Sequence, residues 1–384
     1  MTASDGFCMK NAMGDWQLQR WPITTDASLQ AWDAADSLLL THVSELLAQR
    51  PAGYANVLLL NDAHGALATS LHSLSPVSWS DSCLAHRAAE ENLRRNGIAS
   101  PLRKLASTQT PDGPIDLVLI RVPKTNALLE DQLARLRPCL DADTVVVAAA
   151  MVKHLQKSAF VCMEQYLGKV TTSLAVKKAR LLFVDIDRNL PERRSPYPSE
   201  FTDTETGMTL LNHANVFSRS HLDHGARFLL SHYADLPKSV QVVDLGCGNG
   251  VLGIALQQIM PDARVQFIDE SYSAVASARD NHERYFAGRA VQADFQVADG
   301  LEKRASGSVD LVLCNPPFHQ QHVLGDQLAR SMFEGSKRCL RQGGELRVVA
   351  NRHLGYSRTL RQLFGNCRVV ASNDKFAILK SLKR

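Results

Sequence analysis

The sequence DLGCGNG at residues 244–250 follows the apolar run VQVV at residues 240–243. Glycine has no side chain and tolerates positive φ, so a turn of the form D-x-G-x-G-x-G lets the backbone pass close beneath a ligand. The apolar run predicts a buried strand over 240–245, and residues 253–258 after the turn predict a helix. A strand, a glycine-rich turn and a helix in this order predict a nucleotide-like binding site.

The residues around this turn distinguish it from a dinucleotide fingerprint. Counting G-x-G-x-x-G from Gly246 places Val251 where the third glycine belongs, and Asp244 suits an ammonium group better than a pyrophosphate. Asp269 ends a second predicted strand (264–268), where a carboxylate can accept hydrogen bonds from both ribose hydroxyls. The pattern resembles class I methyltransferases, which bind S-adenosylmethionine, and this resemblance makes Asp299 a candidate for the adenine amino group. The candidate cofactor residues are Asp244, Gly246, Gly248, Gly250, Asp269 and Asp299.

A second motif, NPPF at residues 315–318, follows another predicted strand at 309–314. An exocyclic amine or a primary amide is a poor nucleophile because its lone pair is delocalised. The side-chain oxygen of Asn315 and the carbonyl of Pro316 can accept its two N–H bonds and turn the lone pair toward an electrophilic methyl group. Pro317 stiffens this geometry, and Phe318 offers a stacking face for a planar acceptor. These four residues are the predicted catalytic group.

The two halves of the chain repeat one another. DQLAR occurs at 131–135 and at 326–330, IDLVL at 115–119 matches VDLVL at 309–313, and LNDAHGAL at 60–67 lines up with LGCGNGVL at 245–252. The first copy has Asn61 and Ala63 where the second has glycine, and RVPK at 121–124 where the second has NPPF. We therefore expect the first copy to lack cofactor binding and catalysis, with Arg121 and Lys124 as substrate-binding cations.

The repeat sets the predicted domain map. A chain of 384 residues is long for one core, and each copy alternates apolar strands with helices, including predicted helices at 222–230 and 273–286 and a strand at 345–350. This pattern predicts an α/β fold with two tandem Rossmann-like domains, each built on a mostly parallel sheet covered on both faces. Residues 1–188 form the predicted degenerate domain, the proline-bearing residues 189–200 a linker, and residues 201–384 the predicted catalytic domain.

Composition narrows the setting. The eight cysteines form no C-x-x-C pair, which predicts reduced thiols and no metal site. No uncharged apolar run is long enough to span a bilayer, and the N-terminus lacks a secretory pattern, so we expect a cytoplasmic protein without membrane contact. The net charge of +4 is compatible with an RNA partner.

With these residues the chain resembles the ribosomal RNA guanine-N2 methyltransferases of the RsmC/RlmG group. The stretches FHQQH at 318–322, VANRHL at 349–354, HANVFSR at 213–219 and VPKT at 122–125 look like the 23S branch, RlmG. The resemblance implies methyl transfer from S-adenosylmethionine to N2 of a guanine in 23S rRNA or a ribosomal precursor. It also makes Phe217, Ser218 and His319 substrate-binding candidates, and it implies no obligate protein partner.

Four alternatives remain open from the residues. The target can lie in 16S rRNA of the small subunit, and the same tetrad suits the primary amide of a protein glutamine. Adenine N6 also presents an amino group that the tetrad can hold. The fourth alternative is not an enzyme but an RNA-binding assembly factor without catalytic activity. Measuring S-adenosylmethionine binding distinguishes it from the other three.

Overall fold

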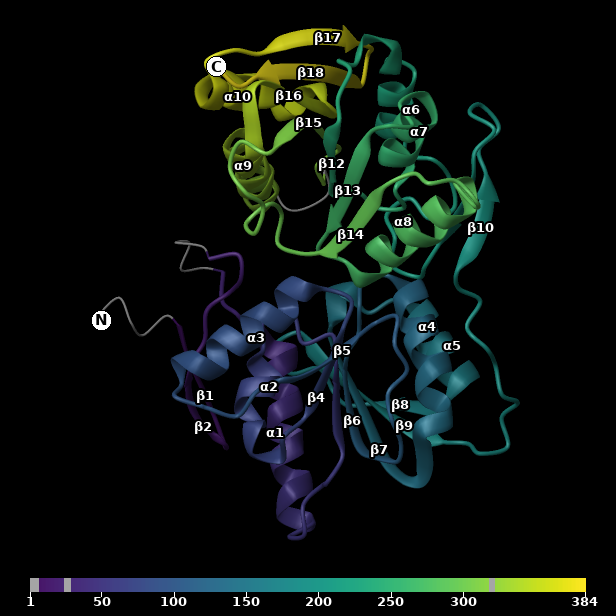
Figure 1. Ribbon diagram of the computed structural model, residues 1–384. Coiled ribbons are helices and arrows are strands. Elements are labelled where there is room, and N and C mark those ends of the chain that lie inside the picture. Colours follow the sequence, from purple (N-terminus) through teal and green to yellow (C-terminus); the bar gives the residue numbers. More distant parts are fainter. Residues whose placement is uncertain (1–6, 24–28, 318–321) are drawn as a thin grey trace. The chain divides into compact units, whose positions relative to one another are not determined.

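The computed structural model describes residues 7–23, 29–317 and 322–384, and the chain divides into two compact units, Met1–Tyr197 and Pro198–Arg384. Each unit contains a seven-stranded sheet with helices on both faces (Figure 1). The strand orders are β5-β4-β3-β6-β7-β9-β8 in the first unit and β14-β13-β12-β15-β16-β18-β17 in the second. The two orders are the same topology, so the repeat seen in the sequence is a repeated fold, and the predicted α/β class is confirmed.

The second unit begins with a hairpin and then alternates strands and helices. Its strands are β10 (Ser199–Thr202), β11 (Thr209–Asn212), β12 (Gln241–Leu245), β13 (Arg264–Asp269), β14 (Ala293–Val297), β15 (Val309–Cys314), β16 (Leu340–Asn351), β17 (Arg368–Ser372) and β18 (Phe376–Leu382). Its helices are α6 (His224–Leu230), α7 (Val251–Ile259), α8 (Tyr272–Tyr285), α9 (His322–Cys339) and α10 (Tyr356–Phe364). The predicted strands and helices of this half are all present.

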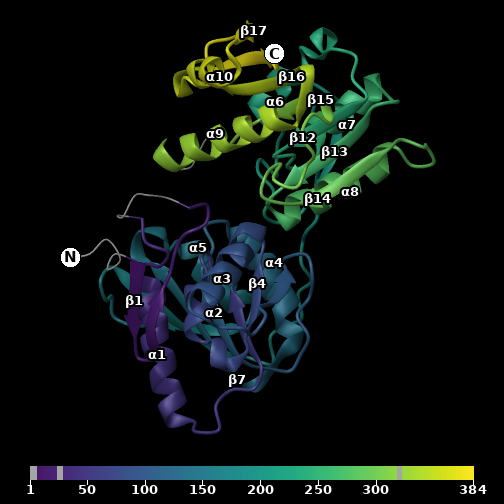
Figure 2. The same cartoon turned by 60° about the vertical axis from the view of Figure 1, so that its left-hand side comes forward.

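The sheet of the second unit is parallel from β14 to β16 and antiparallel only at β18 and β17. All six residues of β15 are buried, as expected for a central strand covered on both faces. One core lies between the sheet and helices α6, α7 and α8, and the other lies under α9 and α10. Figure 2 shows α9 and α10 on one side of this sheet and α8 on the other.

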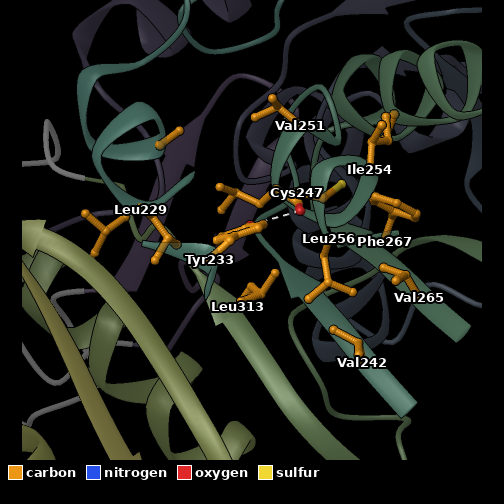
Figure 3. Close-up of a cluster of buried hydrophobic side chains, with 14 of the residues drawn as sticks. Leu229, Tyr233, Val242, Cys247, Val251, Ile254, Leu256, Val265, Phe267 and Leu313 are labelled. Atoms are coloured by element: carbon orange, nitrogen blue, oxygen red, sulfur yellow. Dashed lines mark hydrogen bonds between the residues drawn. The ribbon is translucent and has the colours of Figure 1, made fainter. Parts of the chain in front are cut away.

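The core on the α7 face supports the glycine-rich turn from below. Figure 3 shows Leu229 of α6, Ile254 of α7 and Phe267 of β13 within one buried cluster. Tyr233 is buried in the same cluster, and its hydroxyl donates a hydrogen bond of 2.9 Å to the carbonyl of Leu252 (Figure 3). The first turn of α7 is therefore anchored by apolar packing and one buried hydrogen bond.

The first unit has the same plan. Its strands are β1 (Cys8–Asn11), β2 (Gly14–Gln17), β3 (Val57–Leu60), β4 (Val77–Ser80), β5 (Arg103–Ala106), β6 (Ile115–Arg121), β7 (Leu140–Met151), β8 (Gly168–Thr172) and β9 (Ala179–Ile186). Its helices are α1 (Ala34–Gln49), α2 (Ala66–Ser70), α3 (Cys83–Arg95), α4 (Asn126–Leu136) and α5 (Lys157–Tyr166). Helices α1 to α3 cover one face of the sheet, and α4 and α5 cover the other.

The repeat extends to single side chains that hold the hairpin of each unit. Asn92 on α3 donates to the carbonyls of Gln19 and His64, at 2.9 and 2.8 Å. Asn281 on α8 donates in the same way to the carbonyls of Leu211 and Asn249, at 2.8 and 3.0 Å. In both units a buried amide thus fastens the N-terminal segment to the turn after the first parallel strand.

None of the helices in the described part of the chain is long and apolar enough to cross a membrane. Within the same residues, no group of three or more histidine, cysteine, aspartate or glutamate side chains is placed to hold a metal ion.

Candidate active site

The two predicted motifs of the second unit lie side by side. Leu245 at the end of β12 is paired with Cys314 at the end of β15, so the glycine-rich turn and the NPP segment leave adjacent strands at the same edge. The chain runs from β12 outward to β13 and β14 and then returns to β15 on the other side of β12. This is the point of a parallel sheet where the strand order reverses and where ligands bind.

The turn after β12 has the backbone that the sequence predicted. Gly246, Gly248 and Gly250 have φ values of 70°, 53° and 81°, a region that L side chains rarely adopt. A Cβ atom built on Gly248 would meet none of the described heavy atoms within 4 Å, so the turn borders open space. The turn therefore forms a cradle that a small ligand can approach closely at Gly248, whereas Gly250 faces α8, where an added Cβ would lie 2.9 Å from Cβ of Ala278.

Asp269 is joined to this cradle. Its carboxylate accepts hydrogen bonds of 3.0 Å from the amides of Gly248 and Ser271. Asp299 follows β14, whose last residue pairs with Asp269, and the amide of Ala298 donates to the carbonyl of Asp269 at 2.9 Å. The three carboxylates predicted for the cofactor, which include Asp244 at the end of β12, thus come from neighbouring strand ends.

Asp244 is fully buried, and its two carboxylate oxygens have different surroundings. Its Oδ2 atom accepts the amide of Gly253 on α7 at 2.9 Å, whereas Oδ1 has no hydrogen-bond partner among the described residues. Burial raises the pKa of Asp244 to about 7, the hydrogen bond from Gly253 opposes this, and the charge of Asp269 adds to it. A cationic ligand group beside Oδ1 would stabilise the ionised carboxylate.

Asn315 presents its side chain in a defined orientation. Its Nδ2 atom donates a hydrogen bond of 2.9 Å to Oδ2 of Asp223, the residue that caps the N-terminus of α6. The Oδ1 atom is buried and has no partner within the described part of the chain. Reversing the amide would place two oxygens together, so the carboxylate of Asp223 determines which end of Asn315 is an acceptor.

The other predicted acceptor-site residues have different surroundings. Pro316 is buried and Pro317 is exposed. Phe318 and His319 lie outside the described residues. Phe217 is 54% exposed, and Ser218 has a φ of 55° and donates its hydroxyl to the carbonyl of His221 at 2.9 Å. The structure thus brings Asn315 and Pro316 to the glycine turn and leaves Phe217 on the surface of its unit.

Arg121 does not fit its predicted role as an RNA contact. Its guanidinium is largely buried and forms ion pairs with Asp33, at 3.0 Å, and with Asp36. Burial alone would lower the pKa of Arg121, but the two carboxylates more than offset burial and raise that pKa above its ordinary value. Because its charge is already neutralised inside the first unit, Arg121 is unsuited to bind phosphate. Lys124 is exposed and remains a candidate.

A hollow lies at the C-terminal end of β16, the strand that pairs with β15. It has a volume of about 230 Å³ and is lined by residues that follow β16 and by residues of β17 and β18, among them Arg352 and Tyr356. Asn351 also lines it, and the Oδ1 atom of this residue is buried with no partner among the described residues. Since β16 pairs with β15 in parallel, this hollow opens at the same edge as Asn315.

Comparison with known proteins decides the family. Residues 8–188 match the model described as the RLMG N-terminal domain, and residues 207–380 match the methyltransferase small domain. A ribosomal RNA large subunit methyltransferase G from Streptomyces griseus is 46% identical over 379 residues, covering 97% of this chain and 98% of that protein. The chain belongs to the ribosomal RNA large subunit methyltransferase G family. The family member from Pseudomonas syringae pv. tomato is 50% identical over 371 residues, covering 95% and 97%.

A solved structure supports the tandem fold. The T. thermophilus 16S rRNA N2 methyltransferase RsmC, solved with AdoMet and guanosine, aligns with a TM-score of 0.73 over 98% of this chain and 97% of its own, at 20% identity. At that identity the likeness concerns the fold. Family membership confirms the resemblance to the large-subunit branch and makes this chain an rRNA methyltransferase, which removes the non-catalytic reading and disfavours the glutamine one.

One residue of the site was missed by the sequence reasoning. Asp223 was placed only at the start of a helix, yet it contacts Asn315 across 92 positions. The first unit shows the same arrangement, because Asp33 precedes α1 and pairs with Arg121, 88 positions away, and this contact too is visible only in the structure. Arg121 ends β6 and Asn315 directly follows the equivalent strand β15, so the two aspartates occupy equivalent places.

Proposed function

We propose that this protein transfers a methyl group from S-adenosylmethionine to the exocyclic N2 of a specific guanine in 23S rRNA. S-adenosylmethionine supplies an electrophilic methyl carbon. The observation that carries the proposal is the pairing of Leu245 with Cys314, which places a glycine cradle and an oriented Asn315 amide at one switch point.

The cofactor residues follow from the contacts of the cradle. Gly246 and Gly248 are the proposed points of close approach, Gly250 shapes the turn, and Asp269, which accepts the amide of Gly248, is the proposed acceptor for the ribose hydroxyls. The Oδ1 atom of Asp244, which has no hydrogen-bond partner among the described residues, is the proposed acceptor for the ammonium of the methionine part. Asp299 stays the candidate for the adenine amino group.

The acceptor group is held by Asn315 and Pro316. One N–H of the guanine amino group donates to Oδ1 of Asn315 and the other to the carbonyl of Pro316, so the lone pair turns toward the cofactor side of the site. The nitrogen becomes positively charged as it is alkylated and then loses a proton to solvent, so no strong base is needed. Phe318 is the proposed stacking partner of the base, which must be flipped out or single-stranded.

The first unit is proposed as the degenerate, RNA-holding domain of residues 1–188, joined by 189–200 to the catalytic domain of 201–384. Lys124 is its proposed phosphate contact, and the neighbouring Lys153 and His154 are exposed at the same edge of the first sheet. Phe217, Ser218 and His319 remain proposed substrate contacts in the second unit.

The test uses rRNA from a strain that lacks this protein. Purified enzyme and labelled S-adenosylmethionine are incubated with 23S rRNA, with assembled large subunits and, as a control, with 16S rRNA, and the nucleosides are analysed by mass spectrometry. We expect N2-methylguanosine at one site of 23S rRNA. A methylated adenosine, a product only in 16S rRNA, or an unchanged 23S rRNA would contradict the proposal.

A further inference from the structure

The contact between Asp223 and Asn315 points to a further residue of the methyl-transfer machinery, and the inference rests on the proposed function of Asn315. We propose that Asp223 is a positioning residue: its carboxylate fixes the Asn315 amide with Oδ1 toward the acceptor amino group. Asp223 itself does not touch the substrate in this proposal and acts only through Asn315.

The carboxylate is itself held in place. The Oδ2 atom of Asp223 accepts the amide of Ala226 at 2.8 Å and the Asn315 Nδ2 at 2.9 Å. The first bond is an ordinary helix N-cap, which fixes the carboxylate on the rigid end of α6. The second uses this fixed oxygen to orient a side chain whose free Oδ1 would otherwise exchange places with Nδ2. A preorganised acceptor needs no reordering when the amino group arrives.

Gly225 lies against the Asp223–Asn315 pair. A Cβ atom built on Gly225 would lie 3.0 Å from Oδ2 of Asp223 and 3.5 Å from Oδ1 of Asn315. Glycine is a poor helix former, so its presence as the second residue of α6 is not explained by helix propensity. In the first unit the equivalent second residue of α1 is Ala35, beside the Asp33 pair. Thus the aspartate is retained in both units, whereas the glycine beside it occurs only in the second.

The experiment separates positioning from helix capping. Serine caps helices well but is too short to reach Asn315, so Asp223→Ser keeps the cap and removes the contact. We expect turnover to fall about 10- to 100-fold, as for a misplaced reacting group. The affinity for S-adenosylmethionine and the KM for RNA should change less than about threefold (under 1 kcal/mol). Asp33→Ser in the first unit is the matched control, because it removes the equivalent contact and should lower the melting temperature without lowering turnover.

Two further measurements keep the proposal open to refutation. The Asp223→Ser/Asn315→Ala double variant should be no slower than Asn315→Ala alone, since Asp223 acts through that amide. A second double variant, Asp223→Asn/Asn315→Asp, exchanges the carboxylate and the amide. It should be more active than Asn315→Asp alone, because an amide donor and a carboxylate again face each other. The role of Asp223 would be overturned if the turnover losses of Asp223→Ser and Asn315→Ala multiplied in the first double variant. It would also be overturned if the second double variant were no more active than Asn315→Asp.

Failure of the proposed function would look different. The melting temperatures of the same variants are compared without substrate. If the decreases caused by Asp223→Ser and Asn315→Ala are not additive in the double variant, the two side chains interact in the folded protein. If the wild-type enzyme methylates no guanine while this coupling is present, the proposed function fails and the contact stands. If guanine is methylated and neither turnover nor stability is coupled, the positioning proposal alone is wrong.

Discussion

The turns that follow β3 and β12 are copies of one structure with different contents. Asn61 has a φ of 60° and Gly65 a φ of 77°, close to the values of Gly246 and Gly250. In the first unit, however, the Asn61 side chain fills the turn, because it exchanges two hydrogen bonds of 2.9 and 3.0 Å with Gln132 of α4. The comparison shows that one turn backbone can accommodate either glycine or a hydrogen-bonded asparagine at the same position.

The capping carboxylate of the following helix has moved between the two units. Asp244 at the end of β12 accepts the amide of Gly253 at 2.9 Å. In the first unit the strand is apolar there, and Asp62, within the turn, accepts the equivalent amide of Ala68 at 2.8 Å. Both carboxylates are buried, and burial raises the pKa to about 7 for Asp244 and to about 6 for Asp62. The first unit thus satisfies the equivalent helix amide with a carboxylate from the turn rather than from the strand.

The largest expected difference between the units is at the strand exits. Asn315→Ala should reduce turnover by about 10² to 10³, because it removes a preorganised acceptor, while cofactor affinity stays close to wild type. Arg121→Ala at the equivalent place should instead destabilise the first unit by about 3–5 kcal/mol, because it leaves buried carboxylates unpaired. Steady-state kinetics and calorimetric unfolding measure the two effects. Equal turnover in Asn315→Ala and wild type would remove Asn315 from the mechanism.

The second prediction transplants the first unit's turn into the second. Asn tolerates positive φ, so Gly246→Asn should fold, as Asn61 does, yet weaken S-adenosylmethionine binding by more than about tenfold (over 1.4 kcal/mol). Calorimetric titration gives the affinity, and far-ultraviolet circular dichroism checks the fold. Asn61→Gly, at the equivalent position of the first unit, is the matched control and should leave cofactor affinity unchanged. Unaltered binding by Gly246→Asn would show that the ligand does not lie over this turn.

The third prediction concerns pH. An unfolded aspartate has a pKa near 3.9, whereas that of Asp244 is about 7 in the folded state. The native state therefore binds the extra proton, and this contribution to stability is present below about pH 4 and is lost as the pH rises through 7. The melting temperature of Asp244→Asn relative to wild type should thus be higher at pH 8 than at pH 5, without cofactor.

Asp62→Asn is the companion to that experiment. Its pKa is about 6, so the same relative rise should be complete roughly one pH unit lower. Differential scanning fluorimetry across pH 5 to 8 compares both variants with wild type. A relative melting temperature that is flat with pH for both variants would mean that neither carboxyl is protonated in the folded protein.

The smallest expected effect is one in which the units should agree. Ser271 caps α8 through the amide of Ala274 at 3.1 Å, and Ser82 caps α3 through Ala85 at 3.2 Å. Replacing either serine by alanine should cost about 1 kcal/mol. Unfolding in denaturant gives both values. If the two losses in the free energy of unfolding differed by much more than this amount, one of the serines would have a further structural or functional role in its unit.

Much of the fold was predictable because its signals are local. Unbroken apolar runs predicted the central strands, and the glycine spacing predicted the positive φ values of the turn after β12. Short or edge elements such as β14 and β17 were not predicted, since their residues are half-exposed and carry weak periodicity. Arg121 was misjudged because its sequence neighbours give no sign of Asp33 and Asp36, which reach it through the packing of α1.

The amino-acid sequence by itself determined the repeated α/β plan, the glycine turn and the NPPF motif, because strand burial, glycine φ and proline stiffness are properties of residues and their immediate neighbours. Only the tertiary structure decided how these parts work together. The register of β12 and β15 brings Gly246 beside Asn315, and the cap of α6 brings Asp223 to the amide. Hydrogen bonds between residues some 90 positions apart depend on how strands and helices pack, and no local pattern records that packing.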